Sequence, residues 1–192
     1  MRIAALLCLV VAATARAQSP AGRIPIVIET SAGRIEAEVD SAHAPVTAAN
    51  FLRYVDGKLY DAGSFFRVVT PANQPNDSVR IEVIQGGMSQ AHRGDRFPAI
   101  ELERTSVTGL KHVDGTLSMA RGGANTATDN FFVVIGDQPS LDFGGHRNLD
   151  GQGFAAFGRV TKGMDVVRKI QAGAVNVQAL VAPVTIVRVY RR

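Results

Sequence analysis

Residues that could bind a metal or act as a nucleophile are scattered along this 192-residue chain. It contains no H-E-x-x-H motif, no G-x-S-x-G elbow and no G-x-x-x-x-G-K-[ST] loop, and the glycine-rich residues 144–153 lack a following phosphate-binding lysine. We therefore expect no metal site, no cofactor and no covalent acyl transfer. The histidines are interpreted as exposed loop residues without a catalytic role: His43, His92, His112 and His146.

A set of segments spread in order along the chain carries a more specific signal. These are YDAGSFFR at 60–67, VIQGG at 83–87, GTLSMAR at 115–121, NTATDNFF at 125–132 and FGRV at 157–160. Together with TSAGRIEAEV, APVTAANF and GMDVVRKI, they resemble the cyclophilins, a family of peptidyl-prolyl cis-trans isomerases. The resemblance implies an isomerase built on an eight-stranded antiparallel β-barrel with two capping helices, whose binding groove lies on the outer barrel surface.

By this resemblance, Arg67 is the main catalytic group, because it is the arginine of the family's F-x-R segment. An X-Pro bond must lose its partial double-bond character to rotate, against a barrier of about 18–20 kcal/mol, and twisting localises a lone pair on the proline nitrogen. A guanidinium is always charged and holds its donors in a rigid fork, so it can favour the twisted amide over the planar one. This chemistry requires no base, metal or cofactor.

The resemblance also implies a groove that binds the proline ring in an apolar pocket and the peptide backbone along a polar edge. Phe132 and Leu141 match the family's pocket residues, and Gln85 matches its glutamine before the double glycine. The residues expected to bind substrate are Phe65, Glu82, Val83, Gln85, Ala120, Arg121, Gly122, Asn130, Phe132, Leu141 and Phe154.

Several positions depart from the family pattern. Glu82 and Val83 stand where phenylalanine and methionine are usual, and Asn130 replaces a glutamine. We expect the Glu82 carboxylate to lie near Arg67 and to compete with the substrate for its donors. The other departures are Phe66 and Phe154 at histidine positions, Arg121 at an asparagine position, and Ser140 where some members have tryptophan.

Two other classes of function stay open on the sequence. The same barrel could hold unfolded or proline-containing segments with little catalysis, as a peptide-binding chaperone. A secreted barrel that carries a small ligand inside is disfavoured, because small barrels fill their interior with side chains and this chain has no tryptophan to line a cavity.

The elements that must position these residues follow from hydrophobic periodicity. Strand patterns cover residues 24–29, 34–39, 63–69, 79–85, 115–120, 130–135, 155–160 and 184–190. Helices are expected from Pro45 to a stop at Gly57, and over residues 162–171. Many short strands with two helices favour a mainly β fold, a closed antiparallel barrel capped by two α-helices, because closure removes exposed strand edges. The polar residues 70–78 are expected to form a hairpin tip beside the groove.

The first 17 residues have the layout of a secretory signal peptide. They combine Arg2, the apolar residues 3–13 and a small-x-small cleavage site at residues 15–17. A membrane anchor is disfavoured, since a helical span needs about 20 apolar residues, and Cys8 lies inside the apolar run rather than at a lipid attachment site. We expect a cleaved signal peptide at 1–17, a linker at 18–23 and one isomerase domain at 24–192.

Cleavage would leave a mature chain without cysteine, because Cys8 is the only one, and so without disulfides or thiol chemistry. Loss of Arg2 and Arg16 would lower the formal net charge from +4 to +2, which argues against a nucleic-acid partner. We expect an exported monomer without a membrane span, in the periplasm or else secreted. Its expected partners are proline-containing peptides and unfolded exported proteins.

Overall fold

The computed structural model describes residues 22–74 and 78–192 of the chain. The signal peptide predicted for residues 1–17 lies outside the described residues, as do residues 18–21 of the predicted linker. The first strand begins at Arg23, one residue before the predicted start of the domain. None of the helices in the described part of the chain combines the length and hydrophobicity that a bilayer crossing requires.

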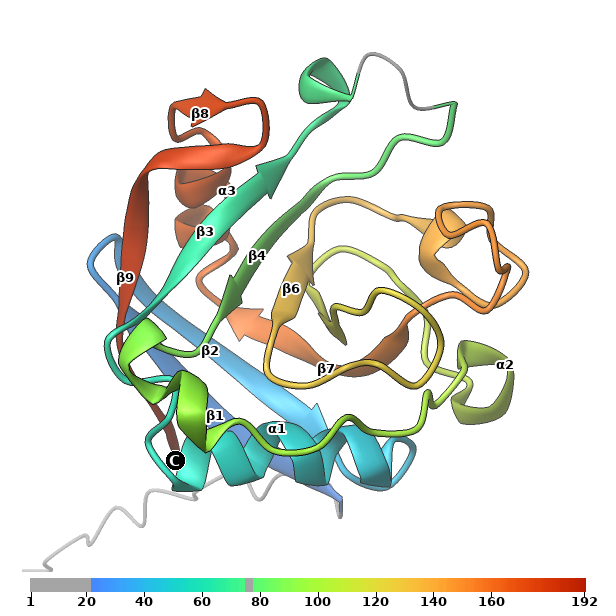
Figure 1. Cartoon of the computed structure of the whole chain (residues 1–192), viewed down its shortest axis with the longest axis horizontal. Coiled ribbons are helices and arrows are strands. Elements are labelled where there is room, and N and C mark those ends of the chain that lie inside the picture. The colour runs from blue at the N-terminus through green and yellow to red at the C-terminus, as the bar shows by residue number, and fades with distance from the viewer. Residues whose placement is uncertain (1–21, 75–77) are drawn as a thin grey trace, which may run out of the picture.

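The strands form one antiparallel sheet that closes on itself (Figure 1). Around the ring the order is β1-β2-β7-β5-β6-β4-β3-β9, and β9 pairs back onto β1, so these eight strands make the predicted barrel. The short strand β8 pairs with β9 and extends the sheet outside the ring. The bounds are β1 Arg23–Thr30, β2 Gly33–Asp40, β3 Gly63–Val69, β4 Val83–Gly87, β5 Thr116–Met119, β6 Phe131–Val134, β7 Ala155–Lys162, β8 Val175–Asn176 and β9 Ala179–Arg191.

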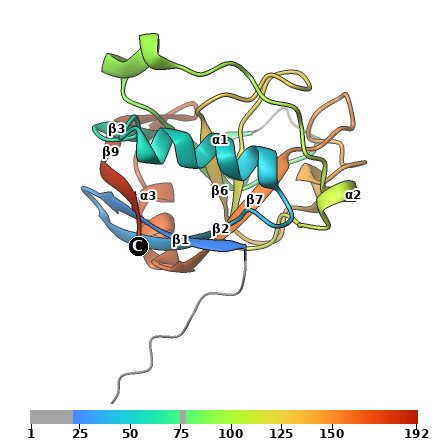
Figure 2. The same cartoon turned by 90° about the horizontal axis from the view of Figure 1, so that it is seen from below.

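The two longer helices pack on different parts of the barrel. Helix α1 (Pro45–Asp56) contacts β2, β7 and β9 and runs along one end of the barrel, as Figure 2 shows. Helix α3 (Met164–Gln171) contacts β2, β3 and β4. As predicted, Pro45 is the first residue of α1, where its missing N–H costs the helix no hydrogen bond. A single helical turn, α2 (Thr105–Thr108), and the 3-10 turns Pro71–Asn73, Gln90–Asp95 and Pro139–Leu141 lie in the connections.

Two predicted strand starts need correction, α3 begins at Met164 rather than at residue 162, and helix α2 was not predicted. The strand expected from residue 79 begins at Val83, because the side chain of Gln74 takes both the N–H and the carbonyl of Ile81 and withdraws them from a ladder. Strand β9 begins at residue 179 rather than 184, and it pairs with the unpredicted β8. Helix α2 is one turn long and has no hydrophobic repeat from which it could be recognised.

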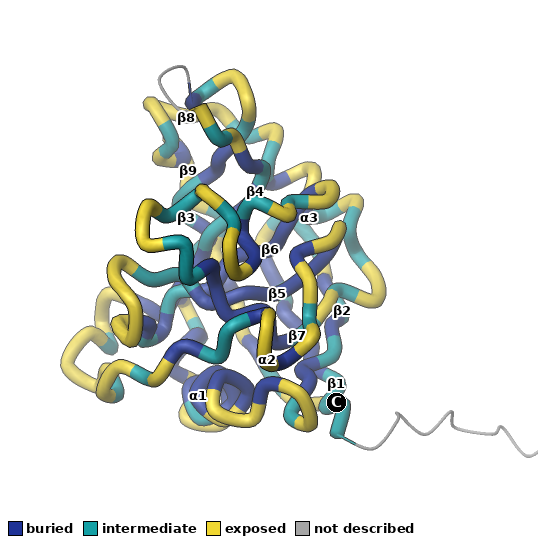
Figure 3. Tube along the Cα trace, turned by 90° about the vertical axis from the view of Figure 1, so that its right-hand side faces the viewer, coloured by how far each residue is buried: buried dark blue, intermediate teal, exposed yellow. Residues whose placement is uncertain are grey.

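Alternation along β6 divides its side chains between two apolar clusters. Phe131 belongs to the barrel core, where its ring packs edge to face on Phe51 and Phe65 at centroid distances of 5.4 and 5.7 Å. Phe132 faces the other way and joins a smaller cluster on the outer surface. Figure 3 shows the buried residues following the strands while the connecting loops are exposed. The outer cluster consists of Val69, Ile81, Val83, Phe132, Val134, Leu141 and Phe154.

Candidate functional site

A pocket of about 250 Å³ opens over this outer cluster. Strands β3, β4 and β6 contribute to it, together with the end of β5 and the loop that joins β6 to β7. The residues that line it are Arg67, Ile81, Val83, Gln85, Ala120, Arg121, Phe132, Leu141, Arg147, Asn148 and Phe154. It therefore combines an apolar floor with three arginine side chains.

The floor of the pocket is rigid and aromatic. Phe132 and Phe154 meet edge to face, with ring centroids 5.5 Å apart and an interplanar angle of 87°. Leu141 is fully buried beside them. Removing such side chains from water stabilises the fold by roughly 1.5–3 kcal/mol each, so the floor keeps its shape when nothing occupies it. Its chemistry suits a small apolar ring or aliphatic side chain.

Arg67 reaches the pocket from β3 at a β-bulge. The register of β3 shifts between Phe65 and Arg67 against both of its neighbours, β4 and β9. A bulge of this kind re-aims the side chain of the strand that carries it. The guanidinium donates to the Gln85 Oε1 through Nη1 at 2.8 Å, and to the Gln178 Oε1 through Nε at 3.0 Å and Nη2 at 2.6 Å.

Arg121 has a different environment on the opposite side of the pocket. Its Nε donates to the Gly153 carbonyl at 2.7 Å, and its guanidinium lies 5.1 Å from the ring centroid of Phe154. Two further hydrogen bonds reach the Asp150 carboxylate. The side chain is 1% exposed, so Arg121 holds the 142–153 loop and the Phe154 ring in place over the floor.

The structure brings together most of the residues predicted for the site. Around one pocket lie Arg67, Val83, Gln85, Ala120, Arg121, Phe132, Leu141 and Phe154. The order of these residues in the sequence does not show this proximity, since they come from different strands and one long loop. They meet because β5, β6, β4 and β3 are consecutive in the ring.

The predicted positions of Phe65 and Glu82 are wrong. Phe65 is fully buried in the barrel core against Phe131, because the bulge between Phe65 and Arg67 puts these two side chains on opposite faces of β3. Glu82 lies between Ile81 and Val83, which both line the pocket, and its Oε2 accepts a hydrogen bond of 2.9 Å from the Gln171 side chain on α3. The carboxylate is therefore held toward α3 and does not line the pocket.

Gly122 and Asn130 also lie outside the pocket lining. Gly122 is exposed, and its N–H donates to the Thr126 hydroxyl at 3.1 Å. The Asn130 carbonyl accepts from the Ala120 N–H, and its side-chain oxygen fills the space that a side chain at Gly87 would need. Asn130 thus supports the backbone of β4 and β5 next to the site.

Four residues at the site were missed from the sequence: Ile81, Arg147, Asn148 and Gln178. Ile81 could have been found, because it is two residues from Val83 and shares its face of the chain. Arg147 and Asn148 lie in a loop with no periodic pattern. Gln178 comes from the β8–β9 turn, and no local feature of the sequence connects it with Arg67.

His112 is a core residue, which contradicts its interpretation as an exposed histidine. It is 1% exposed, and its Nδ1 lies 2.7 Å from the Asp142 Oδ1 while its Nε2 lies 2.9 Å from the Ser118 Oγ. Burial opposes ionisation of Asp142, yet the hydrogen bonds from His112 outweigh it and lower the pKa of that carboxyl. The imidazole also stacks on Phe132, at 6.2 Å between centroids, and so supports the pocket floor from below.

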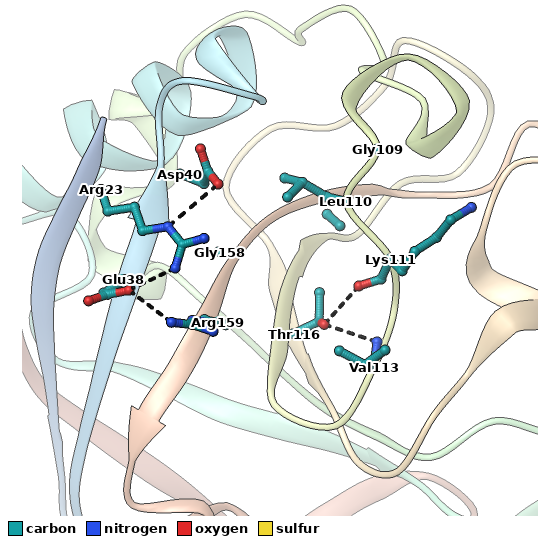
Figure 4. Close-up of a pocket in the computed structure, with 11 residues that line it drawn as sticks. Arg23, Glu38, Asp40, Gly109, Leu110, Lys111, Val113, Thr116, Gly158 and Arg159 are labelled. Atoms are coloured by element: carbon teal, nitrogen blue, oxygen red, sulfur yellow. Dashed lines mark hydrogen bonds and ion pairs between the residues drawn. The ribbon is translucent and has the colours of Figure 1, made fainter. Parts of the chain in front are cut away.

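A second pocket, of about 270 Å³, lies between β1, β2 and β7 and the loop that precedes β5 (Figure 4). Its charged groups on β1, β2 and β7 pair with one another, and Lys111 pairs with Asp142 outside the pocket at 3.6 Å. Arg23 lies 3.5 Å from Glu38 and 4.0 Å from Asp40, and Arg159 lies 3.6 Å from Glu38. None of the residues predicted for the site lines it. Among residues 22–74 and 78–192, no three His, Cys, Asp or Glu side chains gather as a metal site would need.

Comparisons with known proteins agree with this geometry. The family model described as cyclophilin type peptidyl-prolyl cis-trans isomerase matches residues 25–191. A peptidyl-prolyl cis-trans isomerase of Acinetobacter baylyi is 34% identical over 146 residues, which cover 76% of this chain and 70% of that protein. Peptidyl-prolyl cis-trans isomerase B of Escherichia coli is 33% identical over 150 residues, which cover 78% and 85%.

The fold comparison leads to the same family. The crystal structure of a Cryptosporidium parvum cyclophilin type peptidyl-prolyl cis-trans isomerase superposes with a TM-score of 0.70 at 19% identity, covering 88% of this chain and 98% of that one. At this identity the match establishes the barrel fold alone. The family is established by the family model and by the bacterial relatives. The chain belongs to the cyclophilin family of peptidyl-prolyl cis-trans isomerases.

Proposed function

We propose that this enzyme accelerates the isomerisation of X-Pro bonds in exported proteins as they fold, with Arg67 stabilising the twisted amide. The observation that carries the proposal is the shared pocket of Arg67 with Phe132 and Leu141. A proline ring on the apolar floor would bring its nitrogen within reach of the guanidinium at the rim. Uncatalysed isomerisation takes tens to hundreds of seconds and can limit folding.

The chemistry requires the site to bind the twisted amide better than the planar one. As the C–N bond rotates, the nitrogen lone pair leaves conjugation with the carbonyl and becomes able to accept a hydrogen bond. The Arg67 guanidinium donates to that lone pair, and its permanent charge strengthens the hydrogen bond. The aromatic floor holds the ring while the acyl side of the bond rotates. Each step leaves covalent bonds intact, so no proton or group is transferred.

The test is the replacement Arg67→Ala, which should lower kcat/KM on a short proline peptide by at least about tenfold, equivalent to roughly 1.4 kcal/mol. The matched control is Arg159→Ala, because Arg159 is an exposed arginine at the second pocket. The control should retain full activity, and circular dichroism should show both variants folded. Full activity of Arg67→Ala would remove Arg67 from the mechanism.

The same assay distinguishes catalysis from the chaperone alternative. A peptide-binding chaperone would hold the proline peptide with measurable affinity and leave its isomerisation rate unchanged. The structure offers this alternative less support than the sequence did, because Glu82, which departs from the family pattern, is held toward α3 and leaves the pocket unaltered. We therefore propose catalysis as the primary activity and a monomer as the active form, which light scattering of the purified protein would test.

Export is supported by the leader sequence, with its Arg2, apolar residues 3–13 and cleavage site at residues 15–17. We infer cleavage after Ala17 and a periplasmic destination. Mass spectrometry of protein recovered from a periplasmic extract should give a chain that begins at Gln18. An intact Met1 in that fraction would reject cleavage, and recovery from the culture medium alone would favour secretion.

A further inference from the structure

Gln178 lies in the two-residue turn that joins β8 to β9, and this turn lies against Arg67. A single Gln178 Oε1 accepts hydrogen bonds from Nε and Nη2 of Arg67, at 3.0 and 2.6 Å. The Gln85 Oε1 holds Nη1 from the other side at 2.8 Å. We propose that Gln178 is a positioning residue that aims the Arg67 guanidinium at the substrate. This inference rests on the catalytic role proposed for Arg67.

The two acceptors lie on either side of β3: Gln85 belongs to β4, and Gln178 comes directly before β9. Across the bulge, Arg67 is paired with Gln85 on β4 and with Ala179 on β9. Gln178 is the residue directly before Ala179. The bulge that turns Arg67 outward therefore also places one glutamine on each side of its guanidinium. Two contacts on different edges of a planar group fix its plane, whereas one contact would leave it free to swing about that bond.

Gln178 is itself held by its surroundings. Its carbonyl accepts from the Val68 N–H at 2.8 Å, and its side-chain Nε2 donates to the Asn73 carbonyl at 3.3 Å. Asn73 in turn donates to the Val68 carbonyl at 2.9 Å. The backbone and the amide of Gln178 are thus both anchored to the end of β3, so that the Oε1 is oriented before any substrate binds.

The turn keeps this geometry in spite of local strain. Val177, the residue before Gln178, has a φ of 57° although it is β-branched and 76% exposed. A β-branched residue in the left-handed region is a strained conformation that persists where the surrounding structure enforces it. The pairing of β8 with β9 and the contacts of Gln178 with β3 provide that constraint.

Both glutamine oxygens are neutral acceptors. They orient the guanidinium without cancelling its positive charge, which a carboxylate at the same place would do. An arginine aimed in advance loses little freedom when the amide twists, so the benefit appears in the transition state. Gln178 does not line the pocket, so it should not contribute to the affinity of the apolar floor for a proline ring. Loss of Gln178 should therefore lower kcat and leave KM nearly unchanged.

The experiment compares wild type, Gln178→Met, Arg67→Ala and the double variant in an isomerase assay that resolves kcat from KM. Methionine has a similar length but offers no comparable acceptor. We expect Gln178→Met to lower kcat about fivefold, with KM changed less than about twofold, and to have no effect when Arg67 is already alanine. The matched control is Val181→Ala, an exposed residue of the same hairpin, which should leave kcat unchanged.

A second measurement follows the geometry directly. The Arg67 Nε–H resonance in NMR should shift and lose its protection from exchange in Gln178→Met. The same resonance should stay unchanged in Val181→Ala, whereas a general loosening of the hairpin would alter it in both variants. An unchanged kcat in Gln178→Met overturns the inference, as does an equal loss of activity with and without Arg67. Full activity of Arg67→Ala would instead overturn the proposed function, so that the two failures are distinct. If Gln178→Met does not fold, Gln178→Asn, whose amide is too short to reach, takes its place.

Discussion

The guanidinium of Arg121 binds the carboxylate of Asp150 through two parallel hydrogen bonds, Nη1 to Oδ2 at 2.7 Å and Nη2 to Oδ1 at 2.9 Å. These bonds, with a further one from the Gln152 N–H, lower the pKa of Asp150 from its ordinary 3.8 to about 2. Because the folded-state pKa is the lower one, ionised Asp150 stabilises the fold fully above pH 3.8 and loses that effect as the pH falls through about 2.

We therefore predict that Asp150→Asn lowers the melting temperature at neutral pH and that the difference from wild type disappears toward pH 2. Asp150 is exposed to solvent, so the shift should be small and should shrink with added salt. Thermal melts followed by circular dichroism across this range provide the measurement. In an Arg121→Met background the same substitution should have a smaller effect, because only the hydrogen bond from the Gln152 N–H remains to stabilise the carboxylate. A difference that is constant with pH would contradict the assignment.

His112→Ala should destabilise the protein by about 2–4 kcal/mol. The substitution leaves a cavity beneath Phe132 and removes the partner of two buried groups, the Asp142 carboxylate and the Ser118 hydroxyl. Urea unfolding measures the loss, with the exposed His146→Ala as a control that should unfold like wild type. A His112 variant as stable as wild type would show that the hydrogen bonds contribute nothing net.

Val177→Gly should stabilise the protein by about 1 kcal/mol. Glycine adopts a positive φ without the strain that valine carries at 57°, and this gain exceeds the extra entropy that glycine has in the unfolded chain. The valine side chain is largely exposed, so little burial is lost. Urea unfolding should show a higher midpoint with an unchanged slope. The control Val181→Gly, in the extended strand β9, should shift the midpoint the other way.

Glu82→Ala should leave the isomerase activity within about twofold of wild type, because its carboxylate is bound to Gln171 and does not line the pocket. By contrast, Val83→Ala should raise KM, since it removes part of the apolar floor. Steady-state assays on one apolar proline peptide compare the two neighbours. A large change in activity for Glu82→Ala would show that this carboxylate does act at the functional site.

Much of the fold and part of the site were determined by local pattern in the sequence. Alternating apolar residues marked most strands, and the same period of two separates the inward Phe131 from the outward Phe132. Arg67, Gln85 and Leu141 were identified by resemblance alone, and all three line the pocket. These features need no information on how distant strands pair.

The contacts and the burial of individual side chains depended on how the strands pair, and only the tertiary structure decided them. Gln178 meets Arg67 across 111 residues of chain because of a bulge and a hairpin turn that no local pattern announces. The Glu82 carboxylate lies away from the pocket because it accepts a hydrogen bond from Gln171, a residue of α3 that is 89 positions further along the chain. His112 is buried because Asp142 and Ser118, distant in the sequence from each other, provide its hydrogen bonds together. The physical reason is common to all three: burial and hydrogen bonding belong to pairs of residues that only the closed barrel brings into contact.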